Sequence, residues 1–137
     1  MPTRAHHQGK VKFGGSEKVI IYLGAIPPQE IRGNSRRHWA KKNRARSDWR
    51  ESGHVHGMVD CSTLLGSEKI SIQFHFHHNR LIDLDNLCIG MKPWVDGLVD
   101  AGIVPDDSPE HVVYEKAEFS KCKKGESKTV VTIERRE

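Results

Sequence analysis

The sequence has few of the features that mark secreted, membrane or zinc-binding proteins. Its three cysteines, Cys61, Cys88 and Cys122, are odd in number and far apart. They form neither a disulfide framework nor a Cys-x-x-Cys zinc motif, which favours a reducing, cytoplasmic location. No run of about 18 apolar residues is present, so no membrane span is expected. The first residues also lack the apolar segment of a signal peptide.

Apolar residues are scarce as well. They make up 36% of the 137 residues, so the expected core is modest and a dimer interface would add to it. The chain has no repeat, no low-complexity tract and no Gly-rich phosphate loop. Its length fits one domain. Residues 1–16 are polar and Gly-rich and are predicted to be a flexible tail, which leaves residues 17–137 as the domain.

Hydrophobic patterning predicts the secondary structure. Residues 69–78 alternate apolar and polar side chains, as a half-buried strand does, and residues 84–101 carry an apolar stripe of helical period. The order β-α-β-α-β-β indicates a small α+β domain with a mixed sheet and two main helices. In chain order, the predicted elements are strand 18–24, helix 43–60, strand 69–78, helix 84–101 and a hairpin of strands 112–120 and 127–134.

Local signals refine the second helix and the hairpin. Gly102 is placed to cap the helix C-terminus. Pro93 has no backbone N–H and disfavours helical geometry at Lys92, so the helix is expected to kink there or to begin again at Pro93. In the hairpin, one strand is expected to pack against the other through Val113, Ala117 and Phe119 on one side and Val131 and Ile133 on the other.

Six aspartates lie between residues 83 and 107 of a chain whose net charge is +4. Asp83 and Asp85 are one residue apart, and Asp106 and Asp107 follow in a later loop. Such oxygen donors are the ligands that a hard cation such as Mg²⁺ prefers. Taken singly, Asp85 fits a helix N-cap and Asp106 and Asp107 fit a turn. Taken together, the aspartates favour a metal site.

The ordered motifs of this region resemble those of the RusA-type Holliday-junction resolvases. The matching segments cover about a fifth of the chain and are Asp83-Leu84-Asp85-Asn86-Leu87, Lys92, Asp96 to Gly102, and Asp106-Asp107. The resemblance implies a homodimeric, metal-dependent endonuclease domain over residues 17–137 that resolves four-way junctions and other branched DNA. Two active sites related by a two-fold axis would suit the two symmetry-related strands of a junction.

The resemblance also implies roles for individual residues. Asp83, Asp85 and Asp107 would hold Mg²⁺, or Mn²⁺ in its place, and would form the catalytic group together with Lys92. Asp106 would be a further metal ligand. One departure concerns the lysine, which in shorter family members stands about one helical turn after the second motif aspartate. Here Lys92 comes seven residues after Asp85, as if the turn 88–91 were inserted.

A basic segment precedes these motifs. Between residues 32 and 51, eight Arg or Lys stand against two acidic residues, a local charge of +6. Arg and Lys neutralise phosphates and release counterions, so this segment is a candidate DNA-backbone surface. The alternative is a solvated helix face with Trp39 and Trp49 packed on the core. The candidate DNA-binding residues are Arg32, Arg36, Arg37, Lys41, Lys42, Arg44 and Arg46.

Two alternative functions and one alternative site remain open from the sequence. A non-catalytic branched-DNA-binding module would use the basic segment, but carboxylates facing phosphates would repel them. A nucleotide phosphohydrolase is disfavoured because no Gly-rich phosphate loop is present. His75 and His77 fit the polar face of a strand, and a zinc site that joins them with His54, His56 or a cysteine has no supporting spacing.

Overall fold

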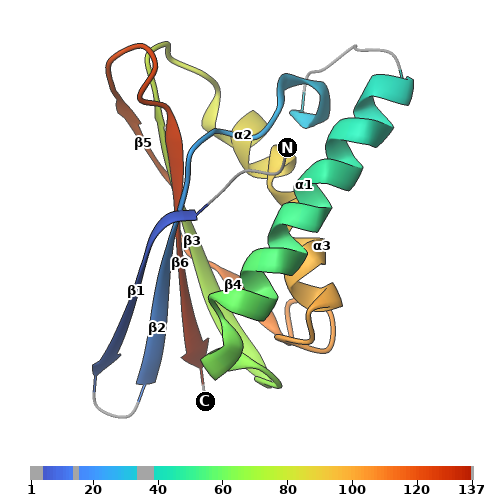
Figure 1. The fold of residues 1–137 in the computed structure, drawn as a ribbon, viewed down its shortest axis with the longest axis vertical. Coiled ribbons are helices and arrows are strands. Elements are labelled where there is room, and N and C mark those ends of the chain that lie inside the picture. Colours follow the sequence, from blue (N-terminus) through green and yellow to red (C-terminus); the bar gives the residue numbers. More distant parts are fainter. Residues whose placement is uncertain (1–4, 14–15, 34–38, 137) are drawn as a thin grey trace.

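A mixed β-sheet forms one layer of the protein and helices cover one of its faces (Figure 1). The structure is a computed structural model that describes residues 5–13, 16–33 and 39–136. Its elements are β1 (Ala5–Phe13), β2 (Ser16–Leu23), η1 (Gln29–Ile31), α1 (Trp39–Val59), η2 (Ser62–Leu64), β3 (Lys69–His78), α2 (Leu84–Gly90), α3 (Lys92–Asp100), β4 (Val112–Tyr114), β5 (Glu118–Lys121) and β6 (Lys128–Arg136).

The sheet is five positions wide and built from six strands in the order β1-β2-β6-β3-β4, with β5 also on β3. The pairs β1–β2, β2–β6 and β6–β3 are antiparallel. β4 and β5 both pair with β3 in parallel, β4 along Ile70–Ile72 and β5 along His75–His78. The predicted α+β domain, with its mixed sheet and two main helical segments, is therefore confirmed.

The predicted hairpin of strands 112–120 and 127–134 is wrong. β3 lies between β5 and β6, because β6 pairs with one edge of β3 and β5 with the other. Val113 lies in β4 and Phe119 in β5, with Ala117 between these strands, and neither strand neighbours β6. The helical crossover α2–α3 explains the arrangement, since it returns the chain parallel to β3 and fills the edge that β6 leaves open.

The N-terminal segment also differs from its expectation. Residues 5–13, predicted to be part of a flexible tail, form β1 and pair with β2 antiparallel from Ala5↔Leu23 to Phe13↔Ser16. Residues 1–4 and 14–15 of that tail lie outside the described residues, and Ser16 is the first residue of β2. No helix in the described ranges combines the length and the apolar character that a bilayer crossing would need.

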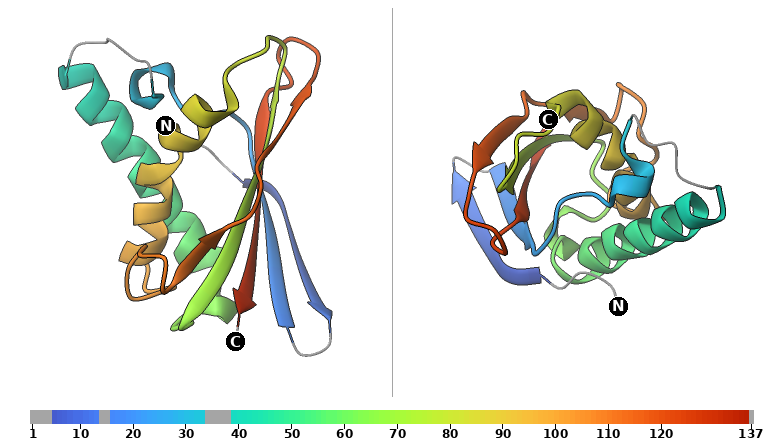
Figure 2. Two further views of the ribbon diagram at one scale, coloured as in Figure 1. Left: turned by 180° about the vertical axis from the view of Figure 1, so that it is seen from behind. Right: turned by 90° about the horizontal axis from the view of Figure 1, so that it is seen from above.

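The core lies between the sheet and the helices. Ile70, Ile72, Phe74 and Phe76 of β3 are buried, which confirms the predicted alternation. β6 supplies Val131 and Ile133 at the matching register, Phe74 opposite Val131 and Ile72 opposite Ile133. The two further views of Figure 2 show the helices on this one side of the sheet. The other face carries polar side chains such as Gln73, Thr132 and Glu134.

α1 and α3 pack closely because glycines stand at their crossing. A Cβ on Gly53 would overlap the carbonyl oxygen of Trp94, and one on Gly97 would overlap that of Arg50. Glycine in a helix interior costs about 1 kcal/mol relative to alanine. Here that cost permits backbone contact between the helices, and the crossing fixes α3 and its charged side chains relative to α1.

The second predicted helix is interrupted, as Pro93 indicates. α2 ends at Gly90, Met91 caps it, and α3 begins at Lys92 with Pro93 in its first turn. Gly102 follows α3 with a φ of 84°, a left-handed conformation that favours glycine. The break at Met91 places the start of α3 directly at the C-terminal end of α2.

Candidate functional site

The first motif aspartate is the N-cap of α2. The Asp83 side chain accepts a hydrogen bond from the Asp85 backbone N–H at 2.9 Å. Such a cap satisfies one of the amide donors that a helix start leaves unpaired. It also fixes the backbone of Asp85, whose side chain lies in the first turn and is exposed. The two carboxylates therefore differ in task, since one holds the turn and the other faces the pocket described below.

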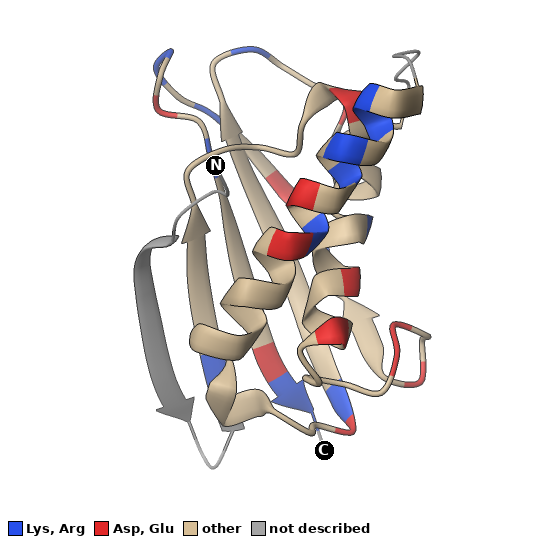
Figure 3. Ribbon diagram, turned by 45° about the vertical axis from the view of Figure 1, so that its right-hand side comes forward, with Lys and Arg blue, Asp and Glu red and all other residues tan. Residues whose placement is uncertain are grey.

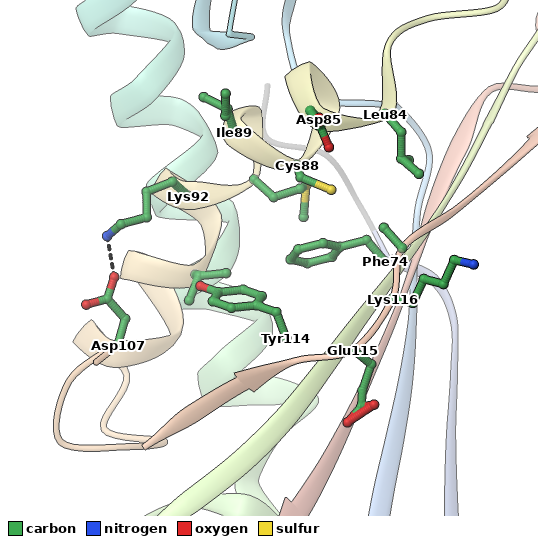
Figure 4. A pocket seen from close by; sticks show the side chains of 13 residues that line it. Phe74, Leu84, Asp85, Cys88, Ile89, Lys92, Asp107, Tyr114, Glu115 and Lys116 are labelled. Atoms are coloured by element: carbon green, nitrogen blue, oxygen red, sulfur yellow. Dashed lines mark hydrogen bonds and ion pairs between the residues drawn. The ribbon is translucent and has the colours of Figure 1, made fainter. Parts of the chain in front are cut away.

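Lys92 links α3 to the loop that follows it. Its ammonium donates to Asp96 Oδ1 at 2.7 Å, one helical turn away, and to Asp107 Oδ2. The contact with Asp107 brings the two distant motifs of the sequence together. Although the helix breaks at Met91, Lys92 and Asp85 line the same pocket (Figure 4).

The electrostatics of this cluster follow from these contacts. Burial alone would lower the pKa of Lys92, but its hydrogen bonds to Asp107 and Asp96 outweigh burial and raise that pKa. The hydrogen bond from Lys92 holds the pKa of Asp107 below its ordinary value. Lysine and carboxylate are therefore both charged at neutral pH.

These charges border a pocket of about 650 Å³ between α2, α3 and β4 (Figure 4). Asp85, Lys92 and Asp107 line it together with apolar side chains, among them Phe74 and Tyr114. Counting Asp96, which contacts Lys92, and the lining residues Glu115 and Lys116, four carboxylates stand against two ammonium groups. The local charge of −2 at neutral pH suits a divalent cation, although the protein as a whole is basic.

The structure brings some of the predicted site residues together and not others. Asp85, Lys92 and Asp107 line one pocket. Asp83 is the adjacent helix cap, and Asp106 instead accepts from the Ser108 N–H at 2.8 Å. Hydrogen bonds from the Ser108 side chain and backbone hold the pKa of Asp106 below its ordinary value.

Within the described ranges no three His, Cys, Asp or Glu side chains form a group that could hold a metal ion. Mg²⁺ is commonly held by one or two carboxylates with water and substrate phosphates completing the shell. Asp85 and Asp107 both line the pocket, so each offers one carboxylate of the kind that this smaller donor set requires.

The candidate DNA-binding residues separate into three groups. Arg36 and Arg37 lie outside the described residues. Arg32 is partly buried, and its Nε donates to the Pro27 carbonyl at 2.9 Å, so it is at least in part structural. Burial lowers the pKa of its guanidinium. The remaining four, Lys41, Lys42, Arg44 and Arg46, lie in the first turns of α1.

The start of α1 therefore forms a basic end, defined as Lys41, Lys42, Arg44 and Arg46 (Figure 3). Its first turn holds no acidic residue. The amide groups at a helix N-terminus carry partial positive charge, so cations placed there are unfavourable for the helix itself. A polyanion bound at this end would offset that cost.

Trp49 is buried and Trp39 is 68% exposed, so only one of the two tryptophans packs on the core.

The strand histidines have structural surroundings. His75 and His77 alternate with the buried Phe74 and Phe76 and so point to the opposite face of the sheet from the helices. Their rings stack with centroids 4.2 Å apart, and His75 contacts Ser120 at 2.7 Å. The polar-face interpretation is supported, and the described residues contain no zinc cluster.

Sequence reasoning left out two residues of the pocket region. Asp96 receives no role in the sequence analysis above, although its spacing of four from Lys92 is the signal for the contact that it makes. Tyr114 had no such signal, because its position beside the pocket depends on the parallel pairing of β4 with β3. Burial, and then the neighbouring Asp107, raise the pKa of its phenol, which is therefore neutral at physiological pH.

Comparison of the chain with protein-family models and with curated proteins finds no match. Function is therefore inferred from the chemistry and geometry of the site itself.

Proposed function

We propose that the protein is a Mg²⁺-dependent endodeoxyribonuclease that cuts branched DNA, four-way junctions above all. The observation that carries the proposal is the ion pair of Lys92 with Asp107 at a pocket that Asp85 of α2 also lines. A turn or a helix cap alone does not require these charged residues to line one pocket. The order and spacing of the motifs, which resemble those of RusA-type resolvases, support the same function.

Each residue has a task in this proposal. Asp85 and Asp107 are the metal ligands. Asp83 is a ligand as well, and as the helix cap it orients Asp85. Asp106, which precedes Asp107 in the loop after α3, is a further ligand at the edge of the site. Mg²⁺, or Mn²⁺ in its place, would acidify a bound water and neutralise charge on the phosphate. Lys92 holds Asp107 in position and presents a positive charge to the phosphodiester.

The basic end of α1 would hold the flanking DNA backbone. Its four cations supply phosphate contacts in addition to the one proposed for Lys92. A homodimer is part of the proposal, because paired incision of a junction requires two sites at a fixed separation. A cytoplasmic location is proposed as well, consistent with the three free cysteines.

One observation favours the alternative of a non-catalytic branched-DNA-binding module. Among the residues that the structure describes, no three potential ligands form a metal-binding group, and Asp83 acts as a helix cap. In that case the carboxylates would only shape α2 and the loop at 106–107.

A single assay separates the two functions. The purified protein is incubated with a labelled four-way junction and with a linear duplex of the same arm sequence, in Mg²⁺ and in EDTA. The nuclease proposal predicts paired nicks near the branch point in Mg²⁺ only, with the duplex intact. Junction binding without cleavage in Mg²⁺ and in Mn²⁺ would instead establish the binding module.

A further inference from the structure

The pocket is larger and more apolar than a metal-bound phosphate requires. Lys92 and Asp107 lie together on one side of the space of about 650 Å³, and Phe74, Ile89 and Tyr114 supply apolar surface to it (Figure 4). Small-molecule sites have this composition, in which apolar walls hold a ligand and a few polar groups orient it. A ligand that fits must therefore have a charged part and a flat or apolar part.

Tyr114 gives the apolar part of the pocket an aromatic surface. Its side chain is 49% exposed, and its ring centroid lies 6.1 Å from that of the buried Phe74. Ile89, which is 55% exposed, borders the same space from α2. A single exposed apolar residue is ordinary, but here two of them, from a helix and a strand, border one pocket.

The backbone that carries Tyr114 is fixed by β3. Tyr114 pairs with Ile72, and the next residue donates its N–H to the Ile72 carbonyl at 2.8 Å. Gln73 of β3 then donates to the Lys116 carbonyl at 3.0 Å. An aromatic ring on an anchored strand loses little conformational freedom when a ligand stacks on it, which strengthens binding.

We propose that this pocket receives one unpaired nucleobase of the DNA, stacked on Tyr114, while the adjoining phosphate lies at Lys92. The inference builds on the proposed function and adds the feature that is recognised. Every base has a π-face, so stacking is tolerant of sequence. Bases at a branch point cost less to extrude than bases inside a duplex, so a base pocket selects branched over linear DNA.

The cations around the pocket agree with a nucleotide as the occupant. The phenol of Tyr114 is neutral and adds no repulsion toward the phosphate. Lys92 lies beside the aromatic surface, and Lys116 also lines the pocket. The basic end of α1 supplies further cations for the rest of the strand. An apolar peptide would have no use for these cations.

The test measures junction binding in EDTA, so that cleavage does not consume the probe. A set of four-way junctions carries one abasic site each, placed in turn at the nucleotides around the branch point, with an abasic site in a distant arm as the control. The wild-type protein is expected to lose roughly tenfold or more in affinity at one branch-point position, as the loss of one stacked base implies.

Variants of Tyr114 connect that loss to the pocket. Tyr114→Leu keeps an apolar side chain but removes the ring, and is expected to weaken binding of the intact junction to a similar degree. On the junction that lacks the critical base it should cost nothing more, because both changes remove the same stacking interaction. Tyr114→Phe keeps the ring and should bind as the wild type does.

Three results would overturn the inference. The first is equal affinity of the wild type for every abasic junction, a result that holds even if Tyr114→Leu fails to fold in a melting control. The second is a Tyr114→Leu loss that persists undiminished on the abasic junction. The third is a change of mass in light scattering caused by Tyr114→Leu, which would assign the pocket to a contact between two copies of the chain.

The outcome is separable from that of the nuclease proposal. Base-dependent binding without Mg²⁺-dependent cleavage would leave the pocket inference standing and reject the nuclease. Cleavage of intact junctions by a protein indifferent to abasic sites would do the reverse. Absence of junction binding by the wild-type protein would reject both.

Discussion

The two ends of α3 carry similar charges in different settings. At its C-terminal end, Asp100 accepts two hydrogen bonds from Arg50 of α1, at 2.6 and 2.8 Å. At its N-terminal end, Lys92 is shared between Asp96 and Asp107. The first pair is balanced and bidentate and joins two helices, whereas the second leaves a surplus of negative charge beside a pocket. Ion pairs at the two ends of one helix therefore do not imply the same role for both ends.

The choice of cation matches this difference. An arginine fork matches a carboxylate geometrically and makes a closed pair, while a lysine is a compact point charge that can shift between partners. Arg50 is a suitable strut between α1 and α3. Lys92 is suited to a site where a phosphate or a metal ion changes the partners of the surrounding carboxylates.

Among substitutions at the two ends of α3, Asp107→Asn at the pocket end should have the largest effect. The amide keeps the shape of the side chain but is a far poorer ligand for a hard cation. Cleavage of a four-way junction should fall by at least about 100-fold, with the melting temperature nearly unchanged because Asp96 still pairs with Lys92. Single-turnover rates and thermal melting measure both. Cleavage within a fewfold of the wild type would remove Asp107 from the site.

Lys92→Met should have the next largest effect. The variant removes the positive charge at the phosphate and leaves Asp107 without its partner. Cleavage should fall by roughly 10- to 100-fold, the order seen when one stabilising group is lost. Lys92→Arg, which restores charge with another geometry, should recover only part of it. Full activity of Lys92→Met would show that this lysine only holds the loop.

Removal of the basic end should weaken DNA binding without altering the pocket. Replacing Lys41, Lys42, Arg44 and Arg46 by Ala should lower the slope of log affinity against log salt by roughly one for each phosphate that is no longer neutralised. A variant with equal charge loss at another surface, with Lys121, Lys123, Lys124 and Lys128 replaced by Ala, is the control. Equal slopes in the two variants would mean that α1 is not the DNA surface.

The smallest effect on cleavage is expected for Asp100→Asn, which removes the ion pair between Arg50 of α1 and Asp100 of α3. Cleavage should stay at the wild-type rate, and stability at neutral pH should fall by less than about 1 kcal/mol because the pair is exposed to solvent. The hydrogen bond from Arg50 lowers the pKa of Asp100, so the pair stabilises the fold above the unfolded value near 4 and loses this contribution as the pH falls through the lowered pKa. The melting temperatures of variant and wild type should therefore converge at acidic pH.

Local patterns predicted much of this fold. The alternation of β3, the interruption at Pro93 and the glycine after α3 all depend on residues close in sequence. Strand pairing does not depend on neighbouring residues alone. The expected hairpin was wrong because β4 and β5 pair with β3, from which the α2–α3 crossover separates them in the chain. Pairing is decided by which edge remains open when the whole sheet assembles.

The site shows the same division. The aspartate motif and Lys92 are visible in the sequence, and their order predicts that they act together. The position of Tyr114 is not visible, because it requires the parallel pairing of β4 with β3. The sequence also does not show that Asp83 caps the helix while Asp85 lines the pocket, because these roles depend on where α2 begins.

The proposed metal site is tested most sharply by three variants compared on one four-way junction in Mg²⁺. Asp83→Asn, Asp85→Asn and Asp100→Asn each remove one negative charge, but only the first two alter the carboxylates of the proposed site. We expect Asp83→Asn and Asp85→Asn to abolish cleavage, to bind the junction as tightly as the wild type or more tightly, and to melt normally, while Asp100→Asn cuts at the wild-type rate. Cleavage by Asp85→Asn at a near wild-type rate would contradict the nuclease proposal and leave a DNA-binding module in its place.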